Sequence, residues 1–264
     1  MRIIAVILIA TALLMPAAQA ADAAFRQWLA AQWPAAEQLG VSRATFDAAT
    51  QNLEPDLTLP DLAIPGQPEQ QPQQAEFVQT PGQYLREPTF ERLAARGKQL
   101  AAQYRDTLSR IEKAFGVPGN VVLAIWARET DYGGYTLPLD AIRTLATQGY
   151  VGKRKDFFRN EFLHALKMLQ DGVPRADMRS SWGGALGLTQ FLPSEYYKHA
   201  VDFDGDGRAD IWHSVPDALA SAAKQLAGKG WRKGERWAYE VRAPQNADCS
   251  IGVPDITMPL GEWL

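Results

Sequence analysis

Glu129 has around it the residue types and spacing that a catalytic acid requires. In the segment 121–133, about 100° of rotation per helical residue places Val122, Trp126 and Glu129 on one stripe. Burial among apolar side chains disfavours the charged form of a carboxyl group and raises its pKa. A glutamate that stays protonated near neutral pH can act as general acid toward a glycosidic oxygen. The alternative interpretation is a glutamate at a fraying helix end that pairs with an arginine.

The helix that carries Glu129 is expected to end at Gly133-Gly134, which would open backbone space near the acid. Asp131 lies about 200° round this helix from Glu129. Asp131 is therefore a poor candidate for a second catalytic carboxylate. The segment 121–133 thus offers Glu129 as its one convincing catalytic acid.

A glycine-rich segment, residues 181–194, is the second candidate. Its glycines at 183, 184 and 187 permit positive φ angles or a close approach of the backbone. Gln190 offers a donor and an acceptor, which suits a sugar hydroxyl or an acetamide group. A tight crossing of two helices lined with small residues explains the same pattern equally well.

An aspartate-rich loop, residues 202–210, matches the first nine positions of a calcium-binding loop. Oxygen ligands of this kind suit a hard cation. His213 stands where the closing glutamate is expected, so Asp217 on the next helix would have to supply the last carboxylate. The alternative is an Asp/Gly turn without an ion, and in either case the loop is structural.

Helical patterns surround these three segments, and the predicted fold class is mainly α. Residues 22–53 are helical in pattern, with Ser42 as the cap of a second helix. The prolines of residues 55–83 exclude a helix there. Further helices are predicted over Glu87–Phe115, from about Val121, over Lys155–Gln170, from Pro193 and over Val215–Ala227. Residues 232–264 are expected to be extended.

The N-terminus is typical of a secretory signal peptide. Arg2 precedes the apolar run Ile3–Met15, and Ala18-Gln19-Ala20 forms a small-residue cleavage pattern. The run is short for a bilayer-spanning helix, and an uncleaved anchor is the alternative interpretation. We expect a periplasmic protein that is not a lipoprotein, because no cysteine lies near the cleavage site, and one without stable membrane insertion after cleavage. Cys249 is the one cysteine, which excludes an intrachain disulfide and a thiolate metal site.

The amino-acid composition limits the classes of molecule that the chain could bind. The net charge of -3 argues against general affinity for nucleic acid. Eight tryptophans and eight tyrosines could stack on the apolar faces of sugars, and the alternative interpretation of each ring is core packing.

In combination and in order, the motifs resemble those of the type-B lytic murein transglycosylases. The resemblance covers most of residues 22–264. It implies a lysozyme-like helical core with a helical extension and a small C-terminal β segment. The matching motifs are Trp126-Ala-Arg-Glu129-Thr130-x-x-Gly133, then Ser181-Trp182-x-Gly184-Ala185-x-Gly187-x-x-Gln190-Phe191-x-Pro193-Ser194, then Val201-Asp-x-Asp-Gly-Asp-Gly-Arg-x-Asp-x-Trp212.

The resemblance also implies roles for individual residues. Glu129 would be the sole catalytic acid/base. A structural calcium ion is implied, and no organic cofactor. The implied substrate-binding residues are Ser181, Gln190, Phe191, Tyr132 and Gly184, and the implied metal ligands are Asp202, Asp204, Asp206, Arg208 through its carbonyl, and Asp217.

The reaction implied by the resemblance is non-hydrolytic cleavage of the β-1,4 bond between N-acetylmuramic acid and N-acetylglucosamine in peptidoglycan. The product carries a 1,6-anhydro end. The partner is the peptidoglycan glycan strand, and we expect a monomer. Two other hypotheses remain open: a hydrolase of the muramidase type, which needs a second carboxylate or a water-positioning group, and a catalytically impaired peptidoglycan-binding protein.

The binding-protein hypothesis depends on two departures from the family pattern. Lys224-Gln225 stands where Asn-Tyr is usual, and the family continues beyond Leu264, so we expect a truncated C-terminal segment. The predicted organisation is a signal peptide at 1–20, a helical segment at 21–54, a Pro/Gln-rich connection at 55–86, a catalytic core at 87–231 with the metal loop at 202–217, and the C-terminal segment at 232–264.

Overall fold

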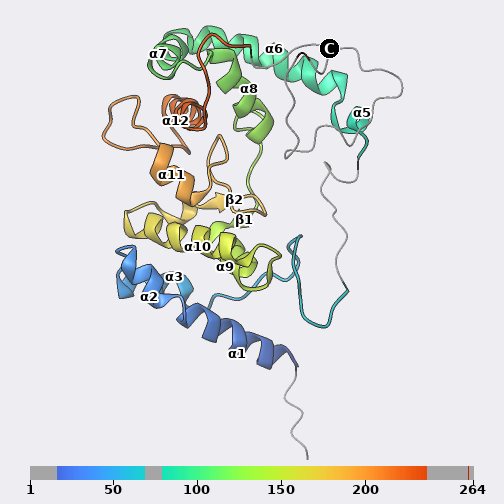
Figure 1. Ribbon diagram of the computed structural model, residues 1–264, viewed down its shortest axis with the longest axis vertical. Helices are drawn as coiled ribbons and strands as arrows, with labels where there is room; N and C mark the ends of the chain where they lie inside the picture. Colours follow the sequence, from blue (N-terminus) through green and yellow to red (C-terminus); the bar gives the residue numbers. More distant parts are fainter. Residues whose placement is uncertain (1–16, 69–78, 237–260, 262–264) are drawn as a thin grey trace, which may run out of the picture. The chain divides into compact units, whose positions relative to one another are not determined.

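Helices are the main secondary structure of the chain that can be described (Figure 1). The computed structural model describes residues 17–68, 79–236 and 261. The prediction of a mainly α fold is confirmed. The described residues up to Trp231 belong to one compact unit.

The first hydrophobic cluster joins the N-terminal helices to two central ones. Phe25, Phe158 and Phe162 are fully buried within it. Ser42 caps α3 as predicted, because its hydroxyl accepts a hydrogen bond from the Thr45 amide at 3.1 Å. The helices are α1 (Ala17–Ala30), α2 (Trp33–Gln38), α3 (Arg43–Thr50), α9 (Ala141–Val151) and α10 (Lys155–Gln170).

Helix α9 was not among the predicted elements. Most of its residues are buried, on every side of the helix. A helix enclosed all round lacks the one-sided apolar stripe that reveals a helix in a sequence. By contrast α10, which keeps such a stripe, begins and ends where the sequence predicts.

A second hydrophobic cluster surrounds the helix that carries Glu129. Ile111, Val122 and Leu219 lie at its centre and are fully buried. The predicted helical stretch Glu87–Phe115 has the expected bounds and consists of two helices that meet at Tyr104, where the backbone leaves the helical region. The helices of this cluster are α6 (Glu87–Gln103), α7 (Arg105–Phe115), α8 (Gly119–Thr130) and α12 (Val215–Gly228).

Short elements connect the two clusters. Strand β1 (Leu139–Asp140) pairs antiparallel with β2 (Arg179–Ser180), with Leu139 opposite Ser180. The glycine-rich segment follows β2 and leads into α11 (Pro193–His199), as predicted for a helix start at Pro193. The exclusion of helices over 55–83 is wrong at its end, because the single-turn helix α5 (Pro81–Tyr84) begins there with a proline at its first position, where a helix tolerates it. A 3₁₀ turn η1 (Arg175–Asp177) completes the described elements.

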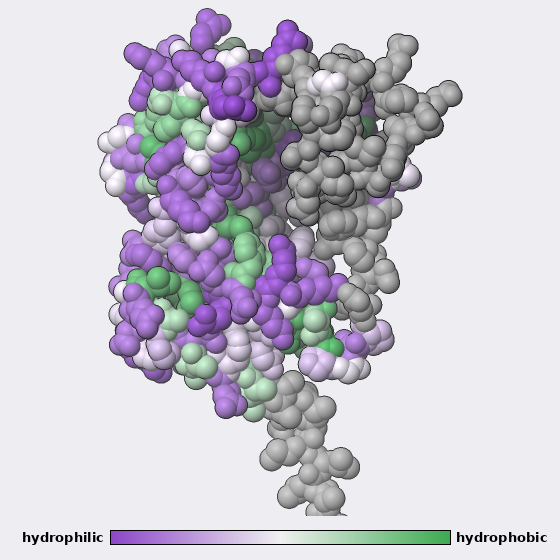
Figure 2. Space-filling view, viewed as in Figure 1, coloured by the Kyte–Doolittle hydropathy of each residue, from purple (hydrophilic) through white to green (hydrophobic). Residues whose placement is uncertain are grey.

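The surface seen in Figure 2 is largely hydrophilic, and its hydrophobic residues gather in small separate patches. None of the helices in the described ranges has the length and apolar character needed to traverse a bilayer. The apolar run Ile3–Met15, Cys249 and most of the predicted extended segment 232–264 lie outside the described residues.

Candidate active site

Helix α8 presents Glu129 one residue before its C-terminal end. The helix ends at Thr130 and not at Gly133-Gly134, because Asp131 and Tyr132 already take left-handed backbone conformations (φ 52° and 58°). Such conformations are uncommon for residues other than glycine. The chain therefore turns away immediately after Glu129, and Asp131 pairs instead with Arg92 at 2.8 Å.

Thr130 fixes the end of α8 to the glycine-rich segment. Its hydroxyl donates a hydrogen bond to the Leu188 carbonyl oxygen at 2.7 Å and accepts one from the Gly133 amide at 3.2 Å. The side chain is buried, so these bonds are shielded from water. Two segments far apart in the sequence are thereby held together beside Glu129.

The glycine-rich segment is a tight backbone turn and not a helix crossing. Leu186 and Phe191 exchange two backbone hydrogen bonds, both of 2.8 Å. Gly184 and Gly187 have φ angles of 81° and 71°. A Cβ atom at Gly184 would collide with Leu145 of α9, so glycine is required there for both conformation and space.

Glu129, Ser181 and Gln190 line one open cavity of about 410 Å³. Glu129 is the one carboxylate among the described residues of its lining. Gln190 donates from its amide nitrogen to the Gly187 carbonyl at 3.1 Å, which orients its side chain. The other lining residues are Arg154, Phe157, Phe158, Trp182, Gly183, Ala185 and Leu192.

The electrostatic setting of Glu129 suits a proton donor. Burial by surrounding protein raises the pKa of its carboxyl above the ordinary value, and the charge of Arg128 partly opposes this shift. Within the described part of the chain, no side chain makes a hydrogen bond or ion pair with the carboxyl. Arg128 instead stacks on Tyr84 and Phe90, so the alternative of an arginine-paired glutamate is not observed.

The expected burial of Glu129 within an apolar stripe is wrong in one respect. Val122 and Trp126 are buried, whereas the surface of Glu129 is exposed to the cavity. Because the helix ends directly after Glu129, its carboxyl reaches past the core. Protein surrounds it closely enough to raise its pKa, while the cavity leaves it open to a ligand.

Three predicted substrate-binding residues do not line this cavity. The ring of Phe191 is 1% exposed and packs with Ile211 in the core. Tyr132 faces α6, where its hydroxyl donates to the Leu93 carbonyl at 3.0 Å. Gly184 is buried against α9. Each of the three supports the fold around the cavity.

The cavity also contains residues that no motif identified as part of the site. Arg154 supplies a cation and stacks on Phe157 and Phe158, with its guanidinium carbon 5.3 and 4.9 Å from the ring centroids. Phe157 is 40% exposed, which is unusual for so large an apolar side chain. Phe157 lies at the start of a predicted helix next to the buried Phe158, and this aromatic pair was the signal that the sequence offered.

The aspartate loop brings together three of the five predicted metal ligands. Carboxylate oxygens of Asp202, Asp204 and Asp217 lie within 4.8 Å of one another, and Asp206 is not in this group. Asp217 is fully buried at the start of α12 and accepts hydrogen bonds from the Phe203 and Asp210 amides at 2.8 and 2.9 Å.

The donor set of this group fits a hard cation. None of its three carboxylates pairs with a lysine, arginine or histidine of the described chain. Clustered anionic oxygens without a cationic side chain favour an ion such as calcium. The carboxylate of Asp206, which lies outside the group, accepts a hydrogen bond from the Arg208 amide at 2.8 Å.

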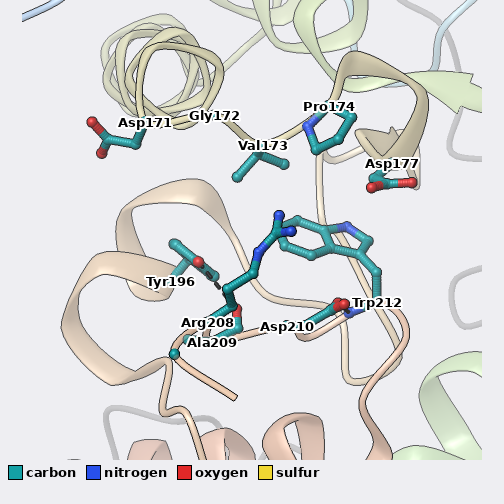
Figure 3. Close-up of a pocket in the computed structure, with 11 residues that line it drawn as sticks. Asp171, Gly172, Val173, Pro174, Asp177, Tyr196, Arg208, Ala209, Asp210 and Trp212 are labelled. Atoms are coloured by element: carbon teal, nitrogen blue, oxygen red, sulfur yellow. Dashed lines mark hydrogen bonds between the residues drawn. The ribbon is translucent and has the colours of Figure 1, made fainter.

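A separate cavity of about 250 Å³ is lined in part by the C-terminal half of the aspartate loop (Figure 3). The Arg208 side chain extends into it beside Trp212 and below Val173. This cavity shares no lining residue with the cavity of Glu129, so the two are distinct features of the fold.

The family comparison agrees with this geometry. A family model described as the transglycosylase SLT domain matches residues 24–264. The chain belongs to this family. The match includes α8, the glycine-rich segment and the aspartate loop.

Individual relatives of this SLT-domain chain are type-B enzymes. Membrane-bound lytic murein transglycosylase B of Escherichia coli (strain K12) is 37% identical over 140 residues, which are 52% of this chain and 38% of that protein. SltB3 from Pseudomonas aeruginosa in complex with NAG-NAM-pentapeptide is similar in structure, with a TM-score of 0.73 and 37% identity over 90% of this chain and 62% of that one.

A third relative is the Escherichia coli lytic transglycosylase Slt35 in complex with calcium. Its TM-score is 0.51, with 32% identity over 55% of this chain and 46% of that one. The SLT-domain chain thus spans less than two thirds of the length of these relatives. The resemblance to type-B lytic transglycosylases and the lysozyme-like fold class are confirmed.

Proposed function

We propose that the chain is a lytic transglycosylase that cleaves the β-1,4 bond between N-acetylmuramic acid and N-acetylglucosamine without water. The observation that carries this proposal is the single carboxylate of the cavity, Glu129, with its raised pKa and no competing partner among the described residues. Ordinary glycosidases require two carboxylates that flank the bond. One acid/base is sufficient when the substrate supplies its own nucleophile.

In this mechanism Glu129 acts first as acid and then as base. The protonated carboxyl donates its proton to the glycosidic oxygen of the leaving N-acetylglucosamine. The resulting carboxylate takes a proton from the C6 hydroxyl of the muramoyl residue, and that oxygen attacks C1 of the same sugar. The C1–O bond to the leaving group breaks, a 1,6-anhydro bond forms, and Glu129 regains its proton.

The walls of the cavity suit a glycan with acidic substituents. The hydroxyl of Ser181 and the amide oxygen of Gln190 can bind sugar hydroxyl and acetamide groups. Phe157 and Trp182 offer aromatic surface to sugar rings. Arg154 carries a guanidinium that can pair with a carboxylate of muramic acid or of its peptide. The complex of the relative SltB3 with NAG-NAM-pentapeptide supports a ligand of this class.

Calcium is proposed as a structural ion held by Asp202, Asp204 and Asp217. A bound calcium ion would neutralise these carboxylates and cross-link the loop to α12. The donor set and the calcium complex of the relative Slt35 support the assignment. No step of the reaction requires the ion.

The proposed location is the periplasm, after removal of residues 1–20. The signal-peptide pattern of the sequence supports it, and peptidoglycan is accessible there.

The decisive experiment incubates purified murein sacculi with residues 21–264 and, in parallel, with the Glu129→Gln variant. Mass spectrometry then identifies the ends of the released muropeptides. Anhydro ends from the unmodified chain and none from the variant are the expected result. Reducing ends would establish hydrolysis instead, and no product from a folded unmodified chain would reject enzymatic cleavage.

A further inference from the structure

Glu161 is a buried carboxylate that the proposed chemistry does not use. It lies in the middle of α10, and 2% of its surface is exposed. No lysine, arginine or histidine in the described part of the chain forms an ion pair with it. Burial of an unpaired charge is costly unless hydrogen bonds satisfy the carboxylate. Its hydrogen-bond partners therefore indicate its role.

The main partner of Glu161 is Ser194. One carboxylate oxygen accepts from the Ser194 backbone amide at 2.8 Å, and the other accepts from the Ser194 hydroxyl at 2.7 Å. The side-chain amide of Asn160 donates a third hydrogen bond at 3.3 Å. Ser194 is 7% exposed, so water has little access to the pair. Buried hydrogen bonds of this kind fix geometry strongly.

This contact anchors the start of α11 to α10, which lie side by side (Figure 1). The first amides of a helix have no partner within the helix. The N-cap residue of α11 is Leu192, whose side chain has no atom that could accept a hydrogen bond from these amides. Glu161 supplies the missing acceptor from the neighbouring helix.

Both anchored elements contribute residues to the lining of the Glu129 cavity. Phe158 lines it from α10, one turn before Glu161. Leu192 and Gln190 line it from the chain that enters α11 just before Ser194. We propose that Glu161 is a positioning residue for glycan binding, because it fixes the segment Gln190–Leu192 relative to the aromatic residues of α10 that line the cavity. This inference rests on the proposed function.

The test measures kcat and KM for release of anhydro-muropeptides from soluble, uncrosslinked peptidoglycan strands. In Glu161→Met a similar volume remains but both acceptors are lost, and we expect KM to rise about tenfold with kcat nearly unchanged. In Glu161→Gln the amide can accept from the Ser194 N–H and donate to its hydroxyl. We therefore expect this variant to restore KM to within about twofold of the original value.

Thr147→Val is the matched control. Thr147 is also fully buried and also holds a distant backbone amide, that of Asp56 at 2.9 Å, but it does not line the cavity. We expect a loss of thermal stability with an unchanged KM. Ser194→Ala, which retains the amide contact, serves if Glu161→Met does not fold, and its KM should rise about threefold.

An unchanged KM in folded Glu161→Met or Ser194→Ala, an equal rise in Thr147→Val, or no recovery in Glu161→Gln would overturn the inference. These outcomes are distinct from failure of the proposed function. If the proposed function is wrong, the unmodified chain itself will release no anhydro product.

Discussion

The hydroxyl of Thr130 and the carbonyl oxygen of Leu188 lie 2.7 Å apart and join the end of α8 to the glycine-rich segment. Glu129 precedes Thr130, and Gln190 follows Leu188 by two residues. One buried hydrogen bond thus couples the candidate acid to a wall of its own cavity.

Loss of this hydrogen bond should reduce the catalytic rate more severely than it reduces the stability of the fold. Thr130→Val leaves the Leu188 carbonyl without its donor, which costs about 1–3 kcal/mol of the free energy of unfolding. We expect kcat for anhydro-muropeptide release to fall by about tenfold or more as Glu129 is misplaced. Thr130→Ser keeps the hydroxyl and should retain most of the activity. Equal kcat values for the valine and serine variants would contradict this role.

Glu129→Gln should abolish the product and stabilise the fold. Because the folded-state pKa of Glu129 is raised, the folded state binds its proton more tightly than the unfolded chain does. That stabilisation is present below the unfolded pKa and is lost as the pH rises through the folded pKa. At neutral and alkaline pH, the Tm of the variant should exceed that of the original chain, and the difference should shrink in acid. Glu91→Gln, at an exposed position of α6, is the control and should change neither quantity.

Removal of the Arg128 charge should move the pH dependence of catalysis. This charge lowers the pKa of Glu129 against the larger effect of burial. Arg128→Gln should therefore raise that pKa and shift the alkaline limb of the kcat profile to higher pH. Arg128→Lys keeps the charge and should leave the limb in place even though stacking on Tyr84 and Phe90 changes. A shift in both variants, or in neither, would refute the electrostatic explanation.

Calcium should stabilise the chain through Asp217. An ion at about 100 times its Kd adds about 2.7 kcal/mol to the free energy of unfolding, so chelation should lower Tm. Asp217→Asn and Asp202→Asn should remove the calcium-dependent part of Tm. Asp206→Asn should retain most of it, because Asp206 lies outside the carboxylate group. Differential scanning calorimetry with and without a chelator makes the comparison, and an unmodified chain that shows no shift would rule out the site.

Gly184 should tolerate no side chain. A Cβ atom at this position would collide with the Leu145 side chain. The backbone φ of 81° is also unfavourable for any residue other than glycine. We expect Gly184→Ala to reduce the free energy of unfolding by at least about 2 kcal/mol. Gly183→Ala is the adjacent control, since its Cβ would meet nothing closer than the Ser181 hydroxyl at 3.9 Å. Denaturant titration of both variants gives the comparison, and similar losses would show that the crowding against α9 is not decisive.

The sequence by itself determined the features that depend on local spacing. The helix that carries Glu129, the bounds of α10, the cap at Ser42 and the aspartate loop all follow from periodicity or from a short motif. These patterns repeat over a few residues, so neighbours along the chain are sufficient to reveal them.

Only the tertiary structure decided which side chains meet. Burial on all sides concealed α9, and packing directed Phe191 and Tyr132 away from the cavity while Arg154 joined it. Glu161 and Ser194 lie 33 residues apart in the sequence, yet they share a buried hydrogen bond. Such contacts depend on how helices pack against one another, and the free energy that selects them comes from burial across the whole core.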